Sequence, residues 1–224
     1  MTQAIEALEI QTAPSPDAAV IWLHGLGADG YDFEPVVPEL RLPTQLRVRF
    51  VFPHAPVRPV TINMGMPMRA WYDILQMGGG GEDETGIRAA QELLEGLIER
   101  EQGRGIAARR IVLAGFSQGG AIVLQTGLRY AQRLGGILAL STYLPLPGTL
   151  REERSAANRD LPVFMAHGTH DPMIPVARAR DSRAALEALG YVVQWQEYAM
   201  PHSVCGEEIA DIAAWLLRLL GPAP

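Results

Sequence analysis

One pentapeptide, Gly115-Phe116-Ser117-Gln118-Gly119, constrains the fold of this chain more than any other segment. It follows an apolar, β-branched run at 110–114 and precedes a second apolar run, which places a serine between a strand and a helix. A serine at such a junction needs a tight turn, and Gly115 and Gly119 leave room where the two backbones nearly touch. The helix N-terminus also directs free N–H groups toward developing negative charge. We therefore predict that Ser117 is a nucleophile; the alternative is a Gly/Ser-rich helix start that packs closely on a sheet.

A serine hydroxyl is a poor nucleophile without a base that is itself oriented by an acid. Where the nucleophilic serine lies in a turn between a strand and a helix, the acid and then the histidine follow the serine along the chain. Of the five histidines, only His167, His170 and His202 come after Ser117. His202 lies between the last predicted strand and the last predicted helix, in a loop that can reach over the sheet. We predict that His202 is the base.

The acid predicted to orient His202 is Asp171, which directly follows the apolar run at 162–166. Loops at the carboxyl ends of parallel strands are where sites of α/β proteins are built. Asp160 precedes the same run and so lies at the wrong end, and Asp181 falls in a predicted helix, where a solvated face explains it. His167 and His170 flank Asp171 and are interpreted as loop-structuring residues, with a role as the base left as the alternative.

A second loop supplies a candidate for stabilising the charge that develops on a substrate oxygen. The apolar run at 18–23 leads into His24-Gly25-Leu26-Gly27. In hydrolases of this kind, the oxyanion hole combines the N–H of the residue after the nucleophile with an N–H from an early strand loop. We therefore predict that the N–H groups of Gln118 and Leu26 form it, and that His24 only shapes the loop.

Apolar segments of strand length alternate with helical patterns along most of the chain, which predicts an α/β sheet covered by helices on both faces. The helical patterns fall at 82–100, where three acidic residues occupy the first turn, at 177–189 and in the C-terminal segment from 209 to 220. A run of four glycines at 78–81 is interpreted as a surface loop. The predicted strands are 4–10, 18–23, 47–52, 110–114, 136–140, 162–166 and 192–197.

Length and composition exclude several classes of function. The 224 residues suit one domain, over 1–224, and the net charge of −6 without a basic cluster argues against nucleic acid and anionic membrane surfaces. All 19 basic residues are arginine, which excludes lysine Schiff bases and a Walker-type lysine. Cys205 is the only cysteine, so neither an intrachain disulfide nor a multi-cysteine zinc site is available. We expect a cytoplasmic enzyme without metal or cofactor and without stable membrane association.

Several sequence blocks together resemble the phospholipase/carboxylesterase family of α/β-hydrolases, which includes bacterial carboxylesterases and acyl-protein thioesterases. The resemblance extends across almost the whole chain and keeps the order of the family's blocks. Those blocks are LHGLGADG (23–30), PHAP (53–56), MRAWYDI (68–74), GFSQGGA (115–121), LSTYLPLP (140–147), AHGTHDPMIP (166–175) and MPHSVC (200–205).

This resemblance implies an α/β-hydrolase core with a mostly parallel central sheet and little or no lid. It implies the triad Ser117, Asp171 and His202, in agreement with the spacing argument, and oxyanion donors at Leu26 and Gln118. It also makes a weak homodimer plausible. By the same matching, the side chains that line the acyl groove are Ile74, Tyr143 and Met173.

From the residues and the resemblance we expect a serine carboxylesterase that hydrolyses short- to medium-chain esters, with thioesters as a secondary class. The alternative is an acyl-protein thioesterase or lysophospholipase that acts on long acyl chains. More distant alternatives are a non-catalytic, ligand-binding relative and an NAD-binding protein, since residues 25–30 spell G-x-G-x-x-G after a strand. Pro35 and Pro38 argue against the long helix that NAD binding requires. Thiol catalysis by Cys205 lacks a histidine–acid pair of its own.

Overall fold

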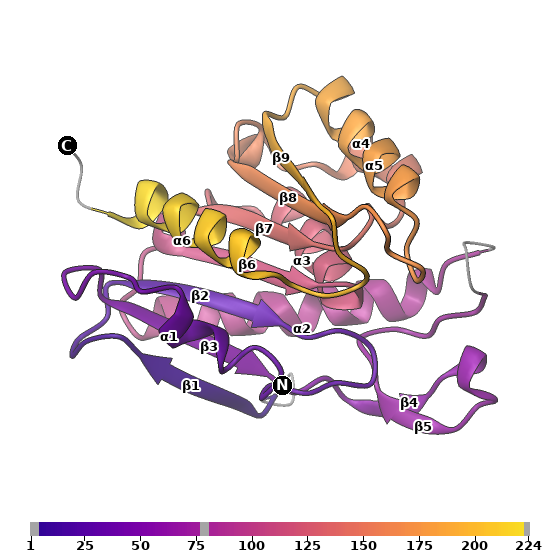
Figure 1. Cartoon of the computed structure of the whole chain (residues 1–224), viewed down its shortest axis with the longest axis horizontal. Helices are drawn as coiled ribbons and strands as arrows, with labels where there is room; N and C mark the ends of the chain where they lie inside the picture. The colour runs from indigo at the N-terminus through magenta and orange to yellow at the C-terminus, as the bar shows by residue number, and fades with distance from the viewer. Residues whose placement is uncertain (1–4, 77–80, 222–224) are drawn as a thin grey trace.

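A computed structural model describes residues 5–76 and 81–221 of the chain (Figure 1). Seven strands form one sheet in the order β1-β3-β2-β6-β7-β8-β9. All neighbours in it are parallel except β1, which runs antiparallel to β3 at the edge. The predicted α/β class with a mostly parallel sheet is therefore confirmed. The strands are β1 (Ala7–Gln11), β2 (Ala18–Leu23), β3 (Val48–Pro53), β6 (Ile111–Phe116), β7 (Gly136–Leu140), β8 (Val163–Gly168) and β9 (Val193–Tyr198).

Helices cover both faces of this sheet because the strand residues alternate between two apolar cores. On β2, Ala19, Ile21 and Leu23 belong to the core beneath α2, α3 and α5. The intervening residues of β2, including Trp22, belong to the core beneath α1 and α6. The helices are α1 (Val36–Glu39), α2 (Glu84–Gly103), α3 (Gln118–Arg129), α4 (Pro147–Glu153), α5 (Val176–Ala188) and α6 (Gly206–Leu220), with 3₁₀ turns η1 (Thr61–Asn63), η2 (Ala108–Arg110) and η3 (Ala156–Asn158).

The boundaries of the predicted elements match the structure best where strands are buried on both sides. β2 and β7 span the predicted residues. β1 begins three residues after the predicted start and ends one residue after the predicted end, and residue 4 of the prediction lies outside the described residues. α2 begins at Glu84 and not at residue 82, because Asp83 is its N-cap and accepts a hydrogen bond from the N–H of Gly86 at 2.9 Å. Of the predicted glycine loop at 78–81, only Gly81 belongs to the described residues.

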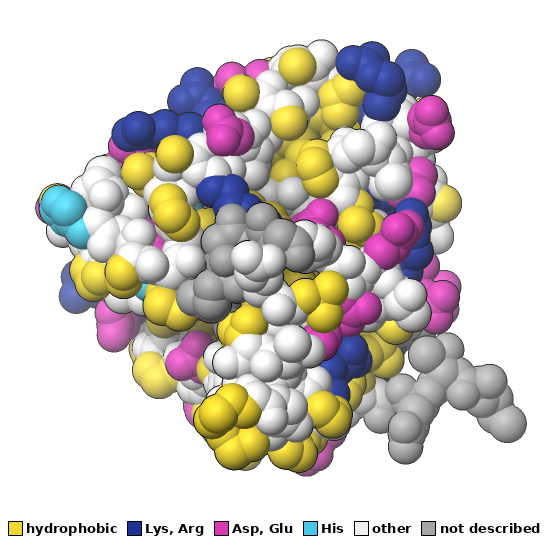
Figure 2. All heavy atoms as spheres, turned by 90° about the vertical axis from the view of Figure 1, so that its right-hand side faces the viewer, with side chains coloured by type: hydrophobic (Ala, Val, Ile, Leu, Met, Phe, Trp, Pro, Cys, Tyr) yellow, Lys and Arg dark blue, Asp and Glu magenta, His cyan; other side chains and the backbone are white. Residues whose placement is uncertain are grey.

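The carboxyl ends of the parallel strands meet at one edge of the sheet, on the right of Figure 1. A small antiparallel hairpin of β4 (Val57–Pro59) and β5 (Pro67–Arg69), which the sequence patterns do not predict, also lies there. Figure 2 looks onto this edge and shows hydrophobic side chains gathered on its surface. No helix within the described ranges has the length and apolar character needed to cross a bilayer.

Candidate active site

Ser117 occupies the sharp turn between β6 and α3, with φ 54° and ψ −118°. A non-glycine residue at positive φ is strained, and such strain collects at functional sites. The turn is possible because its glycines have no side chains: a Cβ on Gly115 would lie 2.4 Å from the carbonyl oxygen of Gly119. A Cβ on Gly119 would lie 2.4 Å from the carbonyl oxygen of Leu23 in β2. The backbone therefore holds Ser117 above the end of the sheet, as predicted.

The three side chains predicted as a triad lie in hydrogen-bonding contact. The Ser117 Oγ lies 2.9 Å from His202 Nε2, and His202 Nδ1 lies 2.6 Å from Asp171 Oδ2. Since the Asp171 carboxylate only accepts, Nδ1–H is the donor to it, which leaves Nε2 free to accept the serine proton. The His202 ring also packs on Phe116, with 4.7 Å between ring centroids. The arrangement is that of a serine poised to transfer its proton to a histidine.

Asp171 is almost completely buried and accepts three hydrogen bonds. Its Oδ1 accepts the backbone N–H groups of Met173 at 2.8 Å and Ile174 at 2.9 Å. Its Oδ2 accepts from His202 and lies 3.3 Å from Nε2 of His167. Burial lowers the pKa of His167, and its Nε2–H donates to the carbonyl of Ile174 at 2.8 Å. His167 is therefore a neutral side chain that holds in place the acid loop, the loop after β8 that carries Asp171.

The acid loop is also joined, backbone to backbone, to the base loop, the segment between β9 and α6 that carries His202. The N–H of Thr169 donates to the carbonyl of Tyr198 at 2.8 Å, and that of His170 donates to the carbonyl of Met200 at 3.1 Å. Gly168 allows this approach, since a Cβ there would lie 2.4 Å from the carbonyl oxygen of Met200. The distance between Asp171 and His202 is thus set by paired main chains as well as by their side chains.

Two residues that line the same groove as Ser117 have backbone N–H groups without a hydrogen-bond partner in the described chain. They are Leu26 and Gln118, whose N–H groups have no acceptor within hydrogen-bonding distance among residues 5–76 and 81–221. The side chain of Gln118 anchors the turn, since its Oε1 accepts from the N–H of Trp71 at 2.8 Å and its Nε2 donates to the carbonyl of Tyr72 at 2.8 Å. Free N–H groups fixed in this way suit a developing oxyanion.

A groove with a volume of about 260 Å³ opens beside the triad. Ile74, Tyr143 and Met173, the three predicted groove residues, all line it. Met173 is 49% exposed at its surface, whereas Tyr143 is buried and its hydroxyl lies 2.8 Å from that of Tyr72. Burial raises the pKa of both tyrosines, which stay neutral. The other groove-lining side chains are largely apolar, but Asp32, Asp73, Glu82 and Arg178 also take part.

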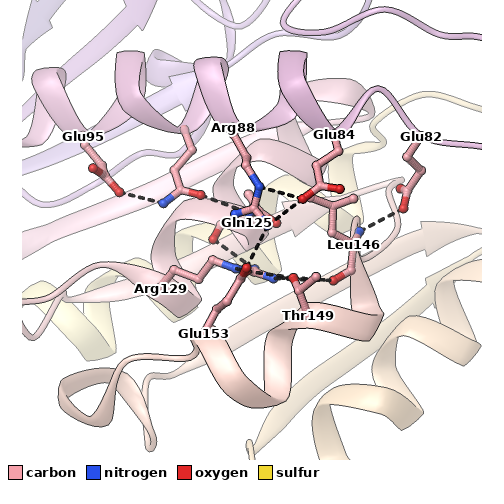
Figure 3. Close-up of polar contacts among 10 residues, drawn as sticks. Glu82, Glu84, Arg88, Glu95, Gln125, Arg129, Leu146, Thr149 and Glu153 are labelled. Atoms are coloured by element: carbon pink, nitrogen blue, oxygen red, sulfur yellow. Dashed lines mark hydrogen bonds and ion pairs between the residues drawn. The ribbon is translucent and has the colours of Figure 1, made fainter.

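The groove wall that carries Tyr143 is tied to α2 and α3 by charged side chains (Figure 3). Glu82 Oε2 accepts the N–H of Leu146 at 3.0 Å. Glu153 on α4 pairs with Arg88 of α2 at 2.7 Å and with Arg129 of α3 at 2.6 Å. Burial alone would raise the pKa of Glu153, but the hydrogen bonds from Arg88 and Arg129 outweigh it and lower the pKa to about 2. These contacts keep the wall in place.

The remaining sequence candidates do not compete for the reaction. His24 Nδ1 lies 2.7 Å from the carbonyl of Gly25 and its Nε2 accepts from the N–H of Ala55 at 3.0 Å, while burial lowers its pKa to about 4. Cys205 is absent from the groove lining of the described chain. The next helix after the G-x-G-x-x-G segment is α1, which has only four residues, so the segment lacks the long helix that NAD binding requires. No group of three potential metal ligands occurs among residues 5–76 and 81–221.

Three contributors to the site are not predicted from the sequence. Thr142 Oγ1 donates to the Ser117 carbonyl at 2.6 Å and so braces the strained turn. Glu82 and Arg178 line the groove, although their helical surroundings suggest solvated positions. The one sequence signal for Thr142 is its place two residues after a predicted strand.

Comparison with known proteins shows which family this chain resembles. The profile of the Phospholipase/Carboxylesterase family matches residues 6–220. Acyl-protein thioesterase 1 of Gibberella zeae is 41% identical over 228 residues, which cover 97% of this chain and 97% of the relative. Acyl-protein thioesterase 1 of Yarrowia lipolytica is 39% identical, over 94% of this chain and 95% of the relative.

Solved structures agree in fold. Arabidopsis thaliana SOBER1 superimposes with a TM-score of 0.86 at 29% identity, over 91% of this chain and 99% of its own. Zea mays acyl-protein thioesterase 2 superimposes with a TM-score of 0.85 at 25% identity, over 96% of this chain and 99% of its own.

Proposed function

This chain belongs to the phospholipase/carboxylesterase family and is a serine hydrolase, and we propose that it cleaves acyl thioesters through Ser117, His202 and Asp171. The observation that carries the proposal is the continuous chain of hydrogen-bonding contacts from Ser117 Oγ through His202 to Asp171, at 2.9 and 2.6 Å. Its position beside an apolar groove supports an acyl substrate.

In the first half of the proposed reaction, Ser117 Oγ attacks the thioester carbonyl carbon while His202 Nε2 takes the hydroxyl proton. The N–H groups of Leu26 and Gln118 hold the resulting oxyanion. The carbon–sulfur bond then breaks, and the leaving sulfur takes the proton from His202. Asp171 stabilises the imidazolium without accepting its proton.

In the second half, water attacks the acyl-serine ester and again gives a proton to His202 Nε2. The bond between the acyl carbon and Ser117 Oγ breaks, the serine recovers its proton, and the free acid leaves. Neither half of the proposed reaction uses a metal or a cofactor, because water is the only co-reactant.

The relatives favour the long-chain alternative over the short-chain carboxylesterase that the sequence analysis put first. Those with 39–41% identity along almost the whole chain are named acyl-protein thioesterases. The groove adds support: Ile74, Leu75 and Met173 line it, and the latter two remain 44% and 49% exposed, as suits a surface that an acyl chain could cover. Each buried methylene contributes about 0.8 kcal/mol, or about fourfold in binding.

The test is kcat/KM for thioesters with one leaving group and acyl chains from C2 to C16, run beside the matching oxygen esters. We expect kcat/KM to rise by about fourfold per methylene until the groove is filled, and thioesters to exceed oxygen esters of equal length. An optimum at short oxygen esters would restore the carboxylesterase reading.

A matched pair of variants separates catalysis from folding. Ser117→Ala should lower turnover by about 10⁴ or more, because triad members act as a unit. Ser15 also has a positive φ, 53° against 54°, but lies exposed in the loop between β1 and β2. Ser15→Ala should leave turnover unchanged. Normal thioesterase activity in Ser117→Ala would refute the mechanism. The weak homodimer and the cytoplasmic location stay predictions.

A further inference from the structure

Arg178, in the first turn of α5, is a cation inside the catalytic groove. It is half-buried and lines the same groove as Ser117 and Met173. Its guanidinium carbon lies 3.4 Å from the centroid of the Tyr143 ring. At this distance the cation is attracted to the aromatic face and loses freedom to turn away. Tyr143 is fixed in turn by the contact between its hydroxyl and that of Tyr72.

The charge of Arg178 is not neutralised by the protein. No carboxylate oxygen of the described chain lies within 4 Å of its guanidinium, and it is the one arginine among the described groove residues. Neighbouring arginines of α5 differ. Arg180 pairs with Glu197 at 2.6 Å and Arg183 with Glu187 at 2.8 Å, and neither lines the groove.

Two of the three carboxylates among the described groove residues, Asp73 and Glu82, accept hydrogen bonds from the protein. Asp73 accepts from both the N–H and the hydroxyl of Thr61, at 2.7 and 2.5 Å. Glu82 holds the N–H of Leu146. Arg178 therefore supplies the arginine charge in a groove whose other charged side chains, within the described residues, are carboxylates.

An arginine held over an aromatic ring presents its planar fork of N–H donors with little freedom to turn. That fork matches the two oxygens of a carboxylate or phosphate, and apolar surroundings strengthen the contact. We infer that Arg178 is a subsite for an oxyanion group, a carboxylate or a phosphate, carried by the ester or thioester substrate. This inference rests on the proposed hydrolase function and adds the chemical class of its preferred substrate.

Two pairs of substrates test it and distinguish the sources of the anion. One pair is a dicarboxylic acid monothioester and the same compound with its free carboxyl methylated, which places the charge on the acyl side. The other pair is a 1-acylglycerol 3-phosphate and the corresponding 1-acylglycerol, which places it on the leaving group. The measured quantity is the ratio of kcat/KM, anionic over neutral, within each pair.

For the unmodified protein we expect a ratio of about ten or more in one pair, as a charge-assisted hydrogen bond supplies. Arg178→Gln should bring that ratio to about one, and Arg178→Lys, which keeps the charge but not the fork, should give an intermediate ratio. Arg180→Gln makes the same charge change on the same helix outside the groove and should leave the ratio unaltered. A ratio within one preparation is insensitive to partial loss of folded protein.

Two results would overturn the inference. One is a ratio of one or less in both pairs for the unmodified protein. The other is an equal loss on anionic and neutral substrates in Arg178→Gln, which would mean that Arg178 merely offsets the negative charge of Glu82. If the protein does not hydrolyse the neutral thioester, the proposed thioesterase activity is refuted. The glycerol ester pair would then still decide the role of Arg178.

Discussion

Replacing Asp171 by asparagine changes one atom and tests the proposed triad directly. The amide oxygen of the variant will occupy the Oδ1 position, because there it accepts two backbone N–H groups, of Met173 and Ile174. Rotating the amide would leave both without an acceptor, at about 1–3 kcal/mol for each one that is buried. The amide NH₂ group therefore takes the Oδ2 position and points a donor at Nδ1 of His202.

Facing a donor, His202 must accept at Nδ1 and carry its proton on Nε2. That tautomer cannot take the proton of Ser117, whose hydroxyl lies 2.9 Å from Nε2. For an aspartate-to-asparagine change in a serine–histidine–aspartate triad, the loss of turnover is about 10⁴. This corresponds to about 5.4 kcal/mol of transition-state stabilisation at about 1.36 kcal/mol per factor of ten. The fold should persist, since the two backbone hydrogen bonds remain.

The assay is kcat on a short p-nitrophenyl ester and on an acyl thioester, with thermal unfolding recorded for each protein. Two other aspartates serve as controls: Asp160 is 86% exposed in a contact with Arg133, and Asp181 is exposed on α5. Both asparagine variants should retain full turnover. A loss of less than tenfold for Asp171→Asn, or a larger loss for either control, would refute the assignment of the acid.

Three further predictions concern stability and metal dependence. Gly119→Ala should lower the melting temperature by at least about 5 °C, because the new Cβ would meet backbone oxygens of Leu23 and His24 at 2.4 and 2.6 Å; Gly148→Ala meets nothing within 4 Å and should not. Burial raises the pKa of Glu208 to about 8, so the folded state keeps a proton that the unfolded state loses above about pH 4.3. Stability should therefore fall between about pH 4.3 and 8 by up to about 1.4 kcal/mol per pH unit from this group, and Glu208→Gln should remove the fall; parallel stability curves of the two proteins would contradict this. Dialysis against EDTA should leave esterase activity intact, and loss restored by zinc would overturn the mechanism.

The central strands and the positions of the triad were predictable for one physical reason. A strand buried on both faces is an unbroken apolar run, as 18–23 and 136–140 are, and its boundaries are visible in the sequence. Parallel strands also bring their carboxyl ends to one edge, so residues that directly follow such runs converge. Ser117 and Asp171 follow this rule, and the loop after β9 brings His202 to them.

Other features depend on contacts that the local sequence does not encode. β4 and β5 are three residues long, include prolines and pair only with each other, so they carry no strand periodicity. Arg178 reads as a solvated residue of a helix, and only the tertiary structure brings Tyr143 under it. The hydrogen bonds between the acid and base loops join main-chain atoms, which have the same chemistry at every residue.

The order in which the site is built along the chain has a consequence for biosynthesis. Ser117 and both proposed oxyanion donors precede residue 119, whereas His202 comes 85 residues after the serine. A nascent chain emerges from its N-terminus, so the serine leaves the ribosome well before its base. Until β8, β9 and α6 have docked, the hydroxyl has no proton acceptor and should be inert toward acyl esters in the cell. A fluorophosphonate that labels Ser117 should therefore mark only finished molecules, and the rate of labelling during refolding would time the last docking step.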